Sequence, residues 1–197
     1  MQQIKWSYSG LKDYINCPKQ YQEVKVLKNF TKYPTEQMLY GTAVHSALED
    51  YVGKKTPLPK NYEQFAKQFD PLVEMEGIKY PEHRMALTYE KKPCTFGARN
   101  YWVRGIADLL VVNGDKAFIV DYKTGSNKYP DLKQLQLMAL MTFAHFEQVQ
   151  TIHAGLLFVM HKHFIPDTYT RDRIEEYWKD FWWNLERLQN SYATDTW

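Results

Sequence analysis

The chain has 197 residues, of which 44% are hydrophobic, and its 25 Lys and Arg nearly balance its 23 Asp and Glu, giving a formal net charge of +2. This composition fits one globular domain with a well-covered core, and it excludes a polycation that binds nucleic acid over its whole surface. No apolar run approaches the roughly 18 residues that cross a bilayer, and the first six residues lack the apolar core of a secretion signal. Two cysteines argue against a disulfide scaffold, so we expect an intracellular, cytoplasmic protein, in the host cytoplasm if the chain is viral.

Helix caps, turn residues and apolar periodicity predict the elements in chain order. The first part should contain a helix from Ser9 to Cys17, a helix over 36–51 capped by Thr35, an aromatic-rich helix from Asn61 limited by Pro71, and strands over 82–90, 98–112 and 116–122. The second part should contain a helix from Pro130 to Phe146, a strand over 151–160, a solvated turn with His161 and His163, and an amphipathic helix from Thr170 to Gln189. This order predicts an α/β fold with a mixed sheet, and Cys17 is expected to be buried.

A hairpin is predicted at Asn113-Gly114, because this dipeptide lies between two apolar runs. A two-residue loop there puts Asp108 opposite Ile119. Since side chains alternate along a strand, Asp108, Asp121 and Lys123 should all leave the same side of the sheet. The two acids would then be diagonal neighbours, roughly 7–8 Å apart between their Cα atoms.

Two acids on such apolar strands require compensating charge. Like charges about 4 Å apart repel by roughly 4 kcal/mol at an effective dielectric near 20, so Lys123 offsets about one acid. A divalent cation would supply the remaining charge. In the alternative, Asp121 and Lys123 are solvated at the end of a strand, and backbone amides cap Asp108.

The motifs carry a resemblance to a known family. Gly-Ile-Ala-Asp at 105–108 and Asp-Tyr-Lys-Thr-Gly at 121–125 resemble motifs two and three of the PD-(D/E)XK nuclease superfamily, and within it the RecB-like exonuclease branch. Segments 7–18, 41–45 and 134–139 resemble the "S-x-S-x-L…Y…C-P", "G-x-x-x-H" and "Q-L-x-x-Y-A" helices of that branch, in the same order. The fifth segment departs from the pattern, since Met138 stands where the family usually has Tyr.

The resemblance implies a restriction-endonuclease-like core with additional helices at both ends. We expect a single nuclease domain over 1–197, with its core motifs at about 36–165, an N-terminal helical part over 1–35 and a C-terminal helix over 166–197. The apolar face of that last helix should pack on the domain, or alternatively on a second copy of the chain. A homo-oligomer or a recombination partner protein is therefore an open expectation.

The resemblance also implies a metal site. His45, Asp108, Asp121 and the backbone carbonyl of Tyr122 would hold one or two ions, and this mixed nitrogen and oxygen set suits Mn²⁺ as well as Mg²⁺. Related CRISPR-associated spacer-acquisition nucleases carry an iron–sulfur cluster on four cysteines. This chain has only Cys17 and Cys94, so we expect no cluster.

The expected reaction is hydrolysis of a phosphodiester bond by a metal-activated water. Asp108, Asp121 and Lys123 are the expected catalytic residues, with Lys123 orienting the water or stabilising developing charge. Glu82 and Gln134 are further candidates, because a glutamate on the first strand and a glutamine on the following helix often line the site in this branch. Glu82 is equally well interpreted as an ordinary charge at the edge of a strand.

Basic residues near these motifs are candidates for contacts to DNA. Arg99 and Arg104 flank the second predicted strand, and Lys128 and Lys133 flank the following helix. They would form a phosphate track if most of them face the Asp108 side, and otherwise they are solvated surface charges. The expected function is that of a metal-dependent DNA exonuclease in recombination, repair or DNA degradation, acting on single strands or duplex ends. The alternatives are a structure-specific or restriction-type endonuclease and a non-catalytic nucleic-acid-binding module.

Overall fold

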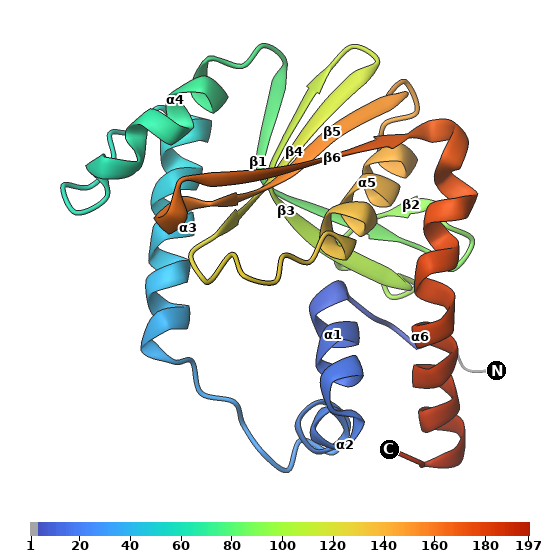
Figure 1. The fold of residues 1–197 in the computed structure, drawn as a ribbon. Helices are drawn as coiled ribbons and strands as arrows, with labels where there is room; N and C mark the ends of the chain where they lie inside the picture. Colours follow the sequence, from blue (N-terminus) through green and yellow to red (C-terminus); the bar gives the residue numbers. More distant parts are fainter. Residues whose placement is uncertain (1–3) are drawn as a thin grey trace.

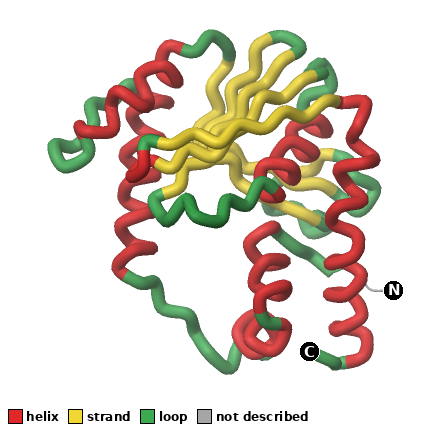
Figure 2. Tube along the Cα trace, viewed as in Figure 1, coloured by secondary structure: helices red, strands yellow, loops and turns green. Residues whose placement is uncertain are grey.

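The computed structural model describes residues 4–197, which form a six-stranded mixed sheet with helices on both faces (Figures 1 and 2). The strands are β1 Ile78–Leu87, β2 Pro93–Cys94, β3 Val103–Asn113, β4 Lys116–Lys123, β5 Thr151–Phe158 and β6 His163–Thr170, in the spatial order β2-β1-β3-β4-β5-β6. Only the β4–β5 pair is parallel among these strands, and the chain between those two strands contains a crossover helix. The predicted α/β class with a mixed sheet is confirmed.

The helices are α1 Tyr8–Asn16, α2 Pro18–Tyr21, α3 Glu36–Lys54, α4 Ala66–Glu74, α5 Lys133–His145 and α6 Ile174–Thr194, with a π-helical segment Gln22–Val26 after α2. Helices α3 and α4 cover one face of the sheet, and α5, α1 and α6 lie on the other (Figure 1). None of the helices in residues 4–197 is long and apolar enough to cross a membrane.

Strand β3 is apolar on both faces because each face is covered by a helical layer. Leu109 and Val111 belong to the core beneath α3 and α4, whereas Leu110 and Val112 belong to the larger core beneath α5. All four side chains are buried. This explains the almost continuous apolar run of the sequence.

The sheet forks at the end of the β3–β4 ladder. The pairs between β3 and β4 run from Asn113–Lys116 to Leu109–Val120 and stop there. Beyond this point β3 continues its ladder with β1, and β4 continues its ladder with β5 (Figure 1). The next rung, which the two strands do not form, would join Asp108 to Asp121.

This register corrects the predicted one by two residues. Gly114 and Asp115 form the tight connection, and Asn113 pairs with Lys116 instead of lying in the loop. Gly114 has φ +59°, which a residue without Cβ adopts readily. Asp108 is therefore in register with Asp121 and not with Ile119.

Several predicted boundaries differ from the structure. Ser7, not Ser9, caps the first helix, which ends at Asn16; a short 3₁₀ helix, Glu63–Phe65, precedes α4; and Pro71 lies inside α4. Cys17 is exposed and caps α2 by accepting from the Gln20 amide, so its predicted burial is wrong. His163 begins β6, a strand that the sequence analysis placed partly in a solvated turn. Pro166 argues against a strand in the sequence, because proline is tolerated within a sheet mainly in edge strands. In the structure β6 is such an edge strand.

The closing helix packs on its own chain. Trp178, Phe181 and Leu185 of α6 are buried in the larger core, and Trp6 joins them there. Trp6 also bridges to Val103 at the start of β3. The N-terminal and C-terminal parts of the described chain thus stabilise the same end of the sheet.

Candidate active site

Asp108 is the first residue of β3 beyond the fork, where its backbone has left the β4 ladder. Its Oδ2 accepts a hydrogen bond of 2.6 Å from the backbone N–H of Tyr122, and it lies 3.5 Å from Nδ1 of His45. The Asp108 side chain thereby binds a backbone amide of β4 at the point where the main-chain pairing of β3 with β4 has ended. The carboxylate is held toward α3 with only 14% of its side chain exposed.

His45 comes from the middle of α3, a helix capped by Thr35, whose hydroxyl accepts from the Met38 amide. The imidazole packs edge-on against Tyr122, with ring centroids 5.7 Å apart. Burial disfavours its charged form, but the hydrogen bond to Asp108 and nearby carboxylates outweigh burial and raise the pKa of His45. The direction of this shift shows that the surroundings of the imidazole are anionic.

Glu82 lies on β1 in register with Asp108, between the paired rungs Pro81–Leu109 and His83–Ala107. Its φ of +47° is in the left-handed region, which is strained for a residue with a side chain. Burial raises the pKa of the Glu82 carboxyl, and the charge of Asp108 raises it further. Glu82 and Asp108 are thus neighbouring acids, and a cation between them would offset their charges.

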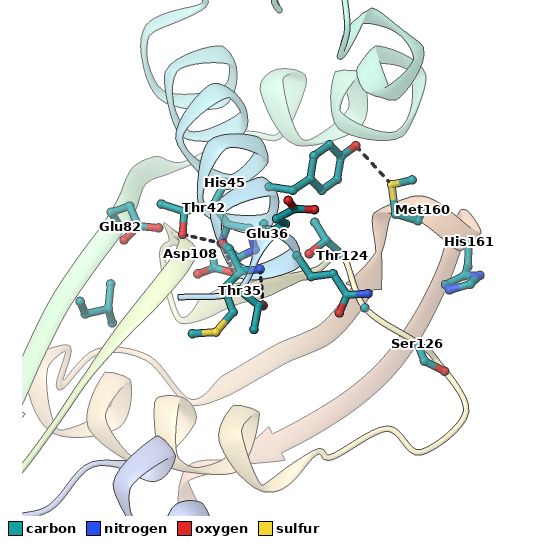
Figure 3. A pocket seen from close by; sticks show the side chains of 16 residues that line it. Thr35, Glu36, Thr42, His45, Glu82, Asp108, Thr124, Ser126, Met160 and His161 are labelled. Atoms are coloured by element: carbon teal, nitrogen blue, oxygen red, sulfur yellow. Dashed lines mark hydrogen bonds and ion pairs between the residues drawn. The ribbon is translucent and has the colours of Figure 1, made fainter. Parts of the chain in front are cut away.

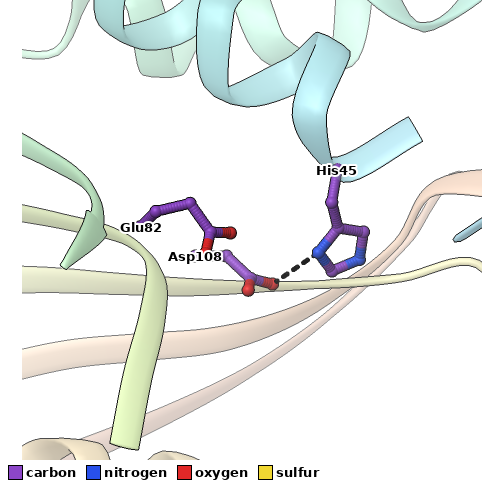
Figure 4. Close-up of side chains that lie close together, drawn as sticks. All are labelled: His45, Glu82 and Asp108. Atoms are coloured by element: carbon purple, nitrogen blue, oxygen red, sulfur yellow. Dashed lines mark ion pairs between the residues drawn. The ribbon is translucent and has the colours of Figure 1, made fainter. Parts of the chain in front are cut away.

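His45, Glu82 and Asp108 each offer one ligand atom, and these atoms all lie within 4.8 Å of one another (Figure 4). Opposite ligands of a divalent ion bound at 2.0–2.5 Å are about 4–5 Å apart, so the spacing fits one cation. One imidazole nitrogen and two carboxylates suit Mn²⁺, and the carboxylates also suit Mg²⁺. The donor set therefore fits a divalent metal.

Asp121, Lys123 and Gln134 form a closed ring of contacts behind that group. Lys123 Nζ lies 2.6 Å from Asp121 Oδ2 and donates to Gln134 Oε1 at 2.9 Å, while Gln134 Nε2 donates to Asp121 Oδ1 at 2.6 Å. Asp121 is only 3% exposed, and burial followed by the charge of Asp108 raises its pKa to about 6, although Lys123 opposes the shift. One lysine thus offsets only part of the acidic charge.

The expectation that both acids leave one side of the sheet needs correction. Asp121 contacts Gln134 of α5, whereas Asp108 contacts His45 of α3, so the carboxylates approach each other from the two helical layers. The fork is the reason, because the strands no longer share a pleat beyond Leu109 and Val120. Glu82, and not Asp121, completes the group of three ligand atoms.

A cavity of about 1290 Å³ opens onto the acids (Figure 3). The N-terminal half of α3, the segment after β4 and the turn after β5 contribute most of its walls, including Thr42, Thr124, Ser126, Met160 and His161. Tyr40 donates a hydrogen bond to Met160 Sδ across the opening. No motif in the sequence indicated this hydroxyl-rich wall.

The predicted DNA-contacting residues do not form one track. Lys133 contacts Asp180 and Gln136 and so stabilises the packing of α5 on α6. Lys128 is exposed and lies over the ring of Tyr129, and Arg99 is exposed between β2 and β3. Arg104 lies on β3 beside a second cavity, which also contains Gln134.

The fold and this arrangement of acids, lysine and imidazole define a nuclease, a class of phosphodiesterase that acts on nucleic acid. The chain belongs to the PD-(D/E)XK nuclease superfamily, whose sequence model matches residues 5–194. This membership confirms the resemblance of the motifs at the level of the superfamily. Members are typically dependent on divalent metals, in agreement with the donor set described above.

Solved structures are similar to this chain at low identity. One is a "Putative exonuclease" from Eubacterium rectale, with a TM-score of 0.57 and 16% identity, over 99% of this chain and 84% of that chain. The protein SSO0001 has a TM-score of 0.45 and 13% identity, over 97% of this chain and 79% of that chain. The sequence has no match among curated proteins.

Proposed function

We propose that this protein is a metal-dependent DNA exonuclease that acts in recombination, repair or degradation of DNA inside the cell. The observation that carries the proposal is the open rung of the fork, where Asp108 and Asp121 are in register and His45 and Glu82 lie close to Asp108. A binding module has no need for a buried acidic pair that costs stability. The preference for DNA and for its ends rests on the order of motifs, which resembles RecB-like exonucleases.

His45, Glu82 and Asp108 would hold the divalent ion, and Asp121 and the Tyr122 carbonyl are the further ligands that the motif resemblance assigns. When bound, Mg²⁺ or Mn²⁺ supplies Lewis acidity, which lowers the pKa of water and offsets charge on the scissile phosphate. The structure supports the first three ligands through the spacing of their donor atoms. One imidazole nitrogen and two carboxylates are suitable ligands for either ion.

Lys123 supplies a positively charged donor at the same place. Its ammonium donates one proton to Gln134 and forms an ion pair with Asp121, whose buried Oδ2 accepts no hydrogen bond from the described residues. A proton that Gln134 does not accept is available to orient a water or to stabilise charge that develops on the phosphate. Gln134 fixes the position of both neighbours, since its amide binds Asp121 and Lys123 at once.

The test compares linear DNA with covalently closed circular DNA, incubated with Mn²⁺ or with a chelator. We expect the protein to degrade only the linear DNA, only with the metal, and the Asp108→Ala variant to lose the activity. Cleavage of the closed circle would instead show an endonuclease. Metal-independent retention of both DNAs without cleavage would show a binding module.

A further inference from the structure

Three cations and two aromatic rings alternate on the surface beside the site. The guanidinium of Arg84 lies 5.6 Å from the ring centroid of Phe96. The guanidinium of Arg104 lies 5.0 Å from the same centroid and 4.8 Å from the ring centroid of Tyr101. Lys5 continues the series with its ammonium 4.7 Å from the Tyr101 ring. We call these five residues the cation–aromatic stack.

Among residues 4–197 the cations of the stack form no ion pair, and Arg84 acts on Glu82 only through its charge at longer range. The ion pairs of the described chain occupy other basic residues, including Lys12 of α1, which pairs with Asp131 at 2.7 Å. Lys5 and Arg84 are exposed, and Arg104 is half-buried. Three positive charges beside two aromatic rings, without ion pairs, suit the binding of a polyanion.

The stack is adjacent to the acids along both strands of the β1–β3 arm. Arg84 is two residues from Glu82, or about 7 Å along β1, and Arg104 is four residues from Asp108, or roughly 13 Å along β3. Arg104 and Phe96 also line a cavity of about 400 Å³ whose far wall includes Gln134. Ile106, two residues from Asp108, lines both this cavity and the larger one, so the two cavities are neighbours.

The two cavities differ in charge. No lysine or arginine is among the described residues that line the larger cavity, where Glu36, Glu82 and Asp108 lie (Figure 3). The guanidiniums of Arg84 and Arg104 lie on the other flank of the acids, where Arg104 lines the smaller cavity. A nucleic-acid strand needs cations along its phosphates, and rings beside those cations allow bases to stack.

We propose that the cation–aromatic stack binds the phosphates of the nucleic-acid strand on the flank of the active site away from α3. This inference rests on the proposed function for the identity of the strand. Arg84 and Arg104 contact successive phosphates, and Phe96 keeps the two guanidiniums in place between them. Neither arginine touches the reacting atoms, so both act on binding and not on the chemical step.

The test measures binding of a fluorescein-labelled oligothymidylate by anisotropy, with EDTA present so that cleavage does not contribute. We expect the Arg84→Gln/Arg104→Gln double variant to bind about tenfold or more weakly at 50 mM salt. The slope of log K against log salt should become shallower by about 1.4, which corresponds to two lost contacts to a single strand. A hairpin duplex measured in parallel distinguishes single-stranded from double-stranded substrates. If the duplex uses the same two arginines, its slope of log K against log salt should become shallower by about 1.8.

The matched control is Lys60→Gln/Lys116→Gln, which removes the same charge from two exposed lysines. Lys116 lies at the tip of the β3–β4 hairpin and Lys60 follows the far end of α3, both distant from the fork. An equal loss in this control would overturn the assignment, because it would reflect net charge alone. Equal dependence of poly-glutamate binding on the two arginines would also overturn it.

The cleavage assay separates this proposal from the proposed function. With Mn²⁺, the arginine double variant should show a raised KM and an unchanged kcat, whereas Asp108→Ala should bind the oligonucleotide and fail to cleave it. If the wild-type protein does not cleave but the arginine variant still loses binding, the nuclease proposal fails and the stack stands. A lowered kcat with unchanged binding would contradict the role given to the stack.

Discussion

At the scale of single residues, the site depends on carboxylates that the fold holds at a cost. Asp121 is almost fully buried, and its closest positive charge, Lys123, is shared with Gln134. The folded-state pKa of Asp121 is raised from 3.8 to about 6. Folding therefore retains a proton that the unfolded chain releases between these two values, and the native state loses stability as the pH rises through this window.

The Asp121→Asn variant tests this linkage in metal-free protein. Below about pH 3 both states of the wild type are protonated, so residue 121 causes no pH-dependent difference. From about pH 3 to pH 7 the free energy of unfolding of the wild type should fall relative to the variant by about 3 kcal/mol, from a shift of about two pKa units. Chemical denaturation at a series of pH values measures the difference, and a constant or rising difference would contradict the shift.

At the scale of elements, α3 carries His45 and must lie at a fixed height above β1. Gly53 near the end of α3 allows this close approach, since a Cβ there would lie 2.6 Å from Cγ of Pro81. Pro81 directly precedes Glu82 on β1. The contact between helix and strand thus also determines how the imidazole lies relative to the carboxylates.

Gly53→Ala should destabilise the protein, although replacing a helical glycine by alanine usually stabilises one. Alanine in place of an exposed helical glycine ordinarily stabilises by about 0.5–1 kcal/mol. Here the clash with the rigid proline ring should make the variant less stable than the wild type by about 1–2 kcal/mol, as overpacking does. Urea unfolding of Gly53→Ala and of Gly53→Ala/Pro81→Ala checks the cause, because the second change should recover most of the loss. A stabilised single variant would show that the contact is not tight.

The sequence was informative at this scale where pattern and geometry agree. A register shift of two residues keeps the parity of each strand, so Asp108 and Asp121 change from predicted diagonal neighbours to residues in direct register and still come together. The left-handed backbone of Glu82 left no signal in the sequence, because it arises only where the β1 and β3 strands bend together at the fork. The sequence also did not indicate Arg84 as a binding residue, because its partner ring, Phe96, lies in an irregular segment after β2.

At the scale of the whole molecule, the two ends of the described chain hold the α1 side of the site. Tyr14 and Ser191 share a buried hydrogen bond of 2.9 Å, and Gln22 donates to Asp195 at 3.0 Å. These contacts join α1 and the following π-helical segment to α6. The wall of the smaller cavity therefore depends on folding of the complete C-terminal helix.

Divalent metal should stabilise the folded protein, because it binds the same acids that lower the stability of the metal-free protein. Ligand that binds only the folded state raises the free energy of unfolding by about 2.7 kcal/mol at a concentration of 100 Kd. Thermal unfolding with increasing Mn²⁺ should show a rising Tm in the wild type and little change in Asp108→Ala. An equal rise in both proteins would place the binding of Mn²⁺ elsewhere.

The open rung also bears on which ions the protein accepts. In a continuous ladder, hydrogen bonds would clamp the two aspartates at one separation and so select one ionic radius. Here each aspartate belongs to a separate arm of the sheet. The side-chain hydrogen bond from the Tyr122 amide to Asp108 joins the arms, so a change in the gap would break no pairing between strands. The protein should consequently discriminate little between Mg²⁺ and Mn²⁺ by size, and its choice should follow the affinity of the imidazole.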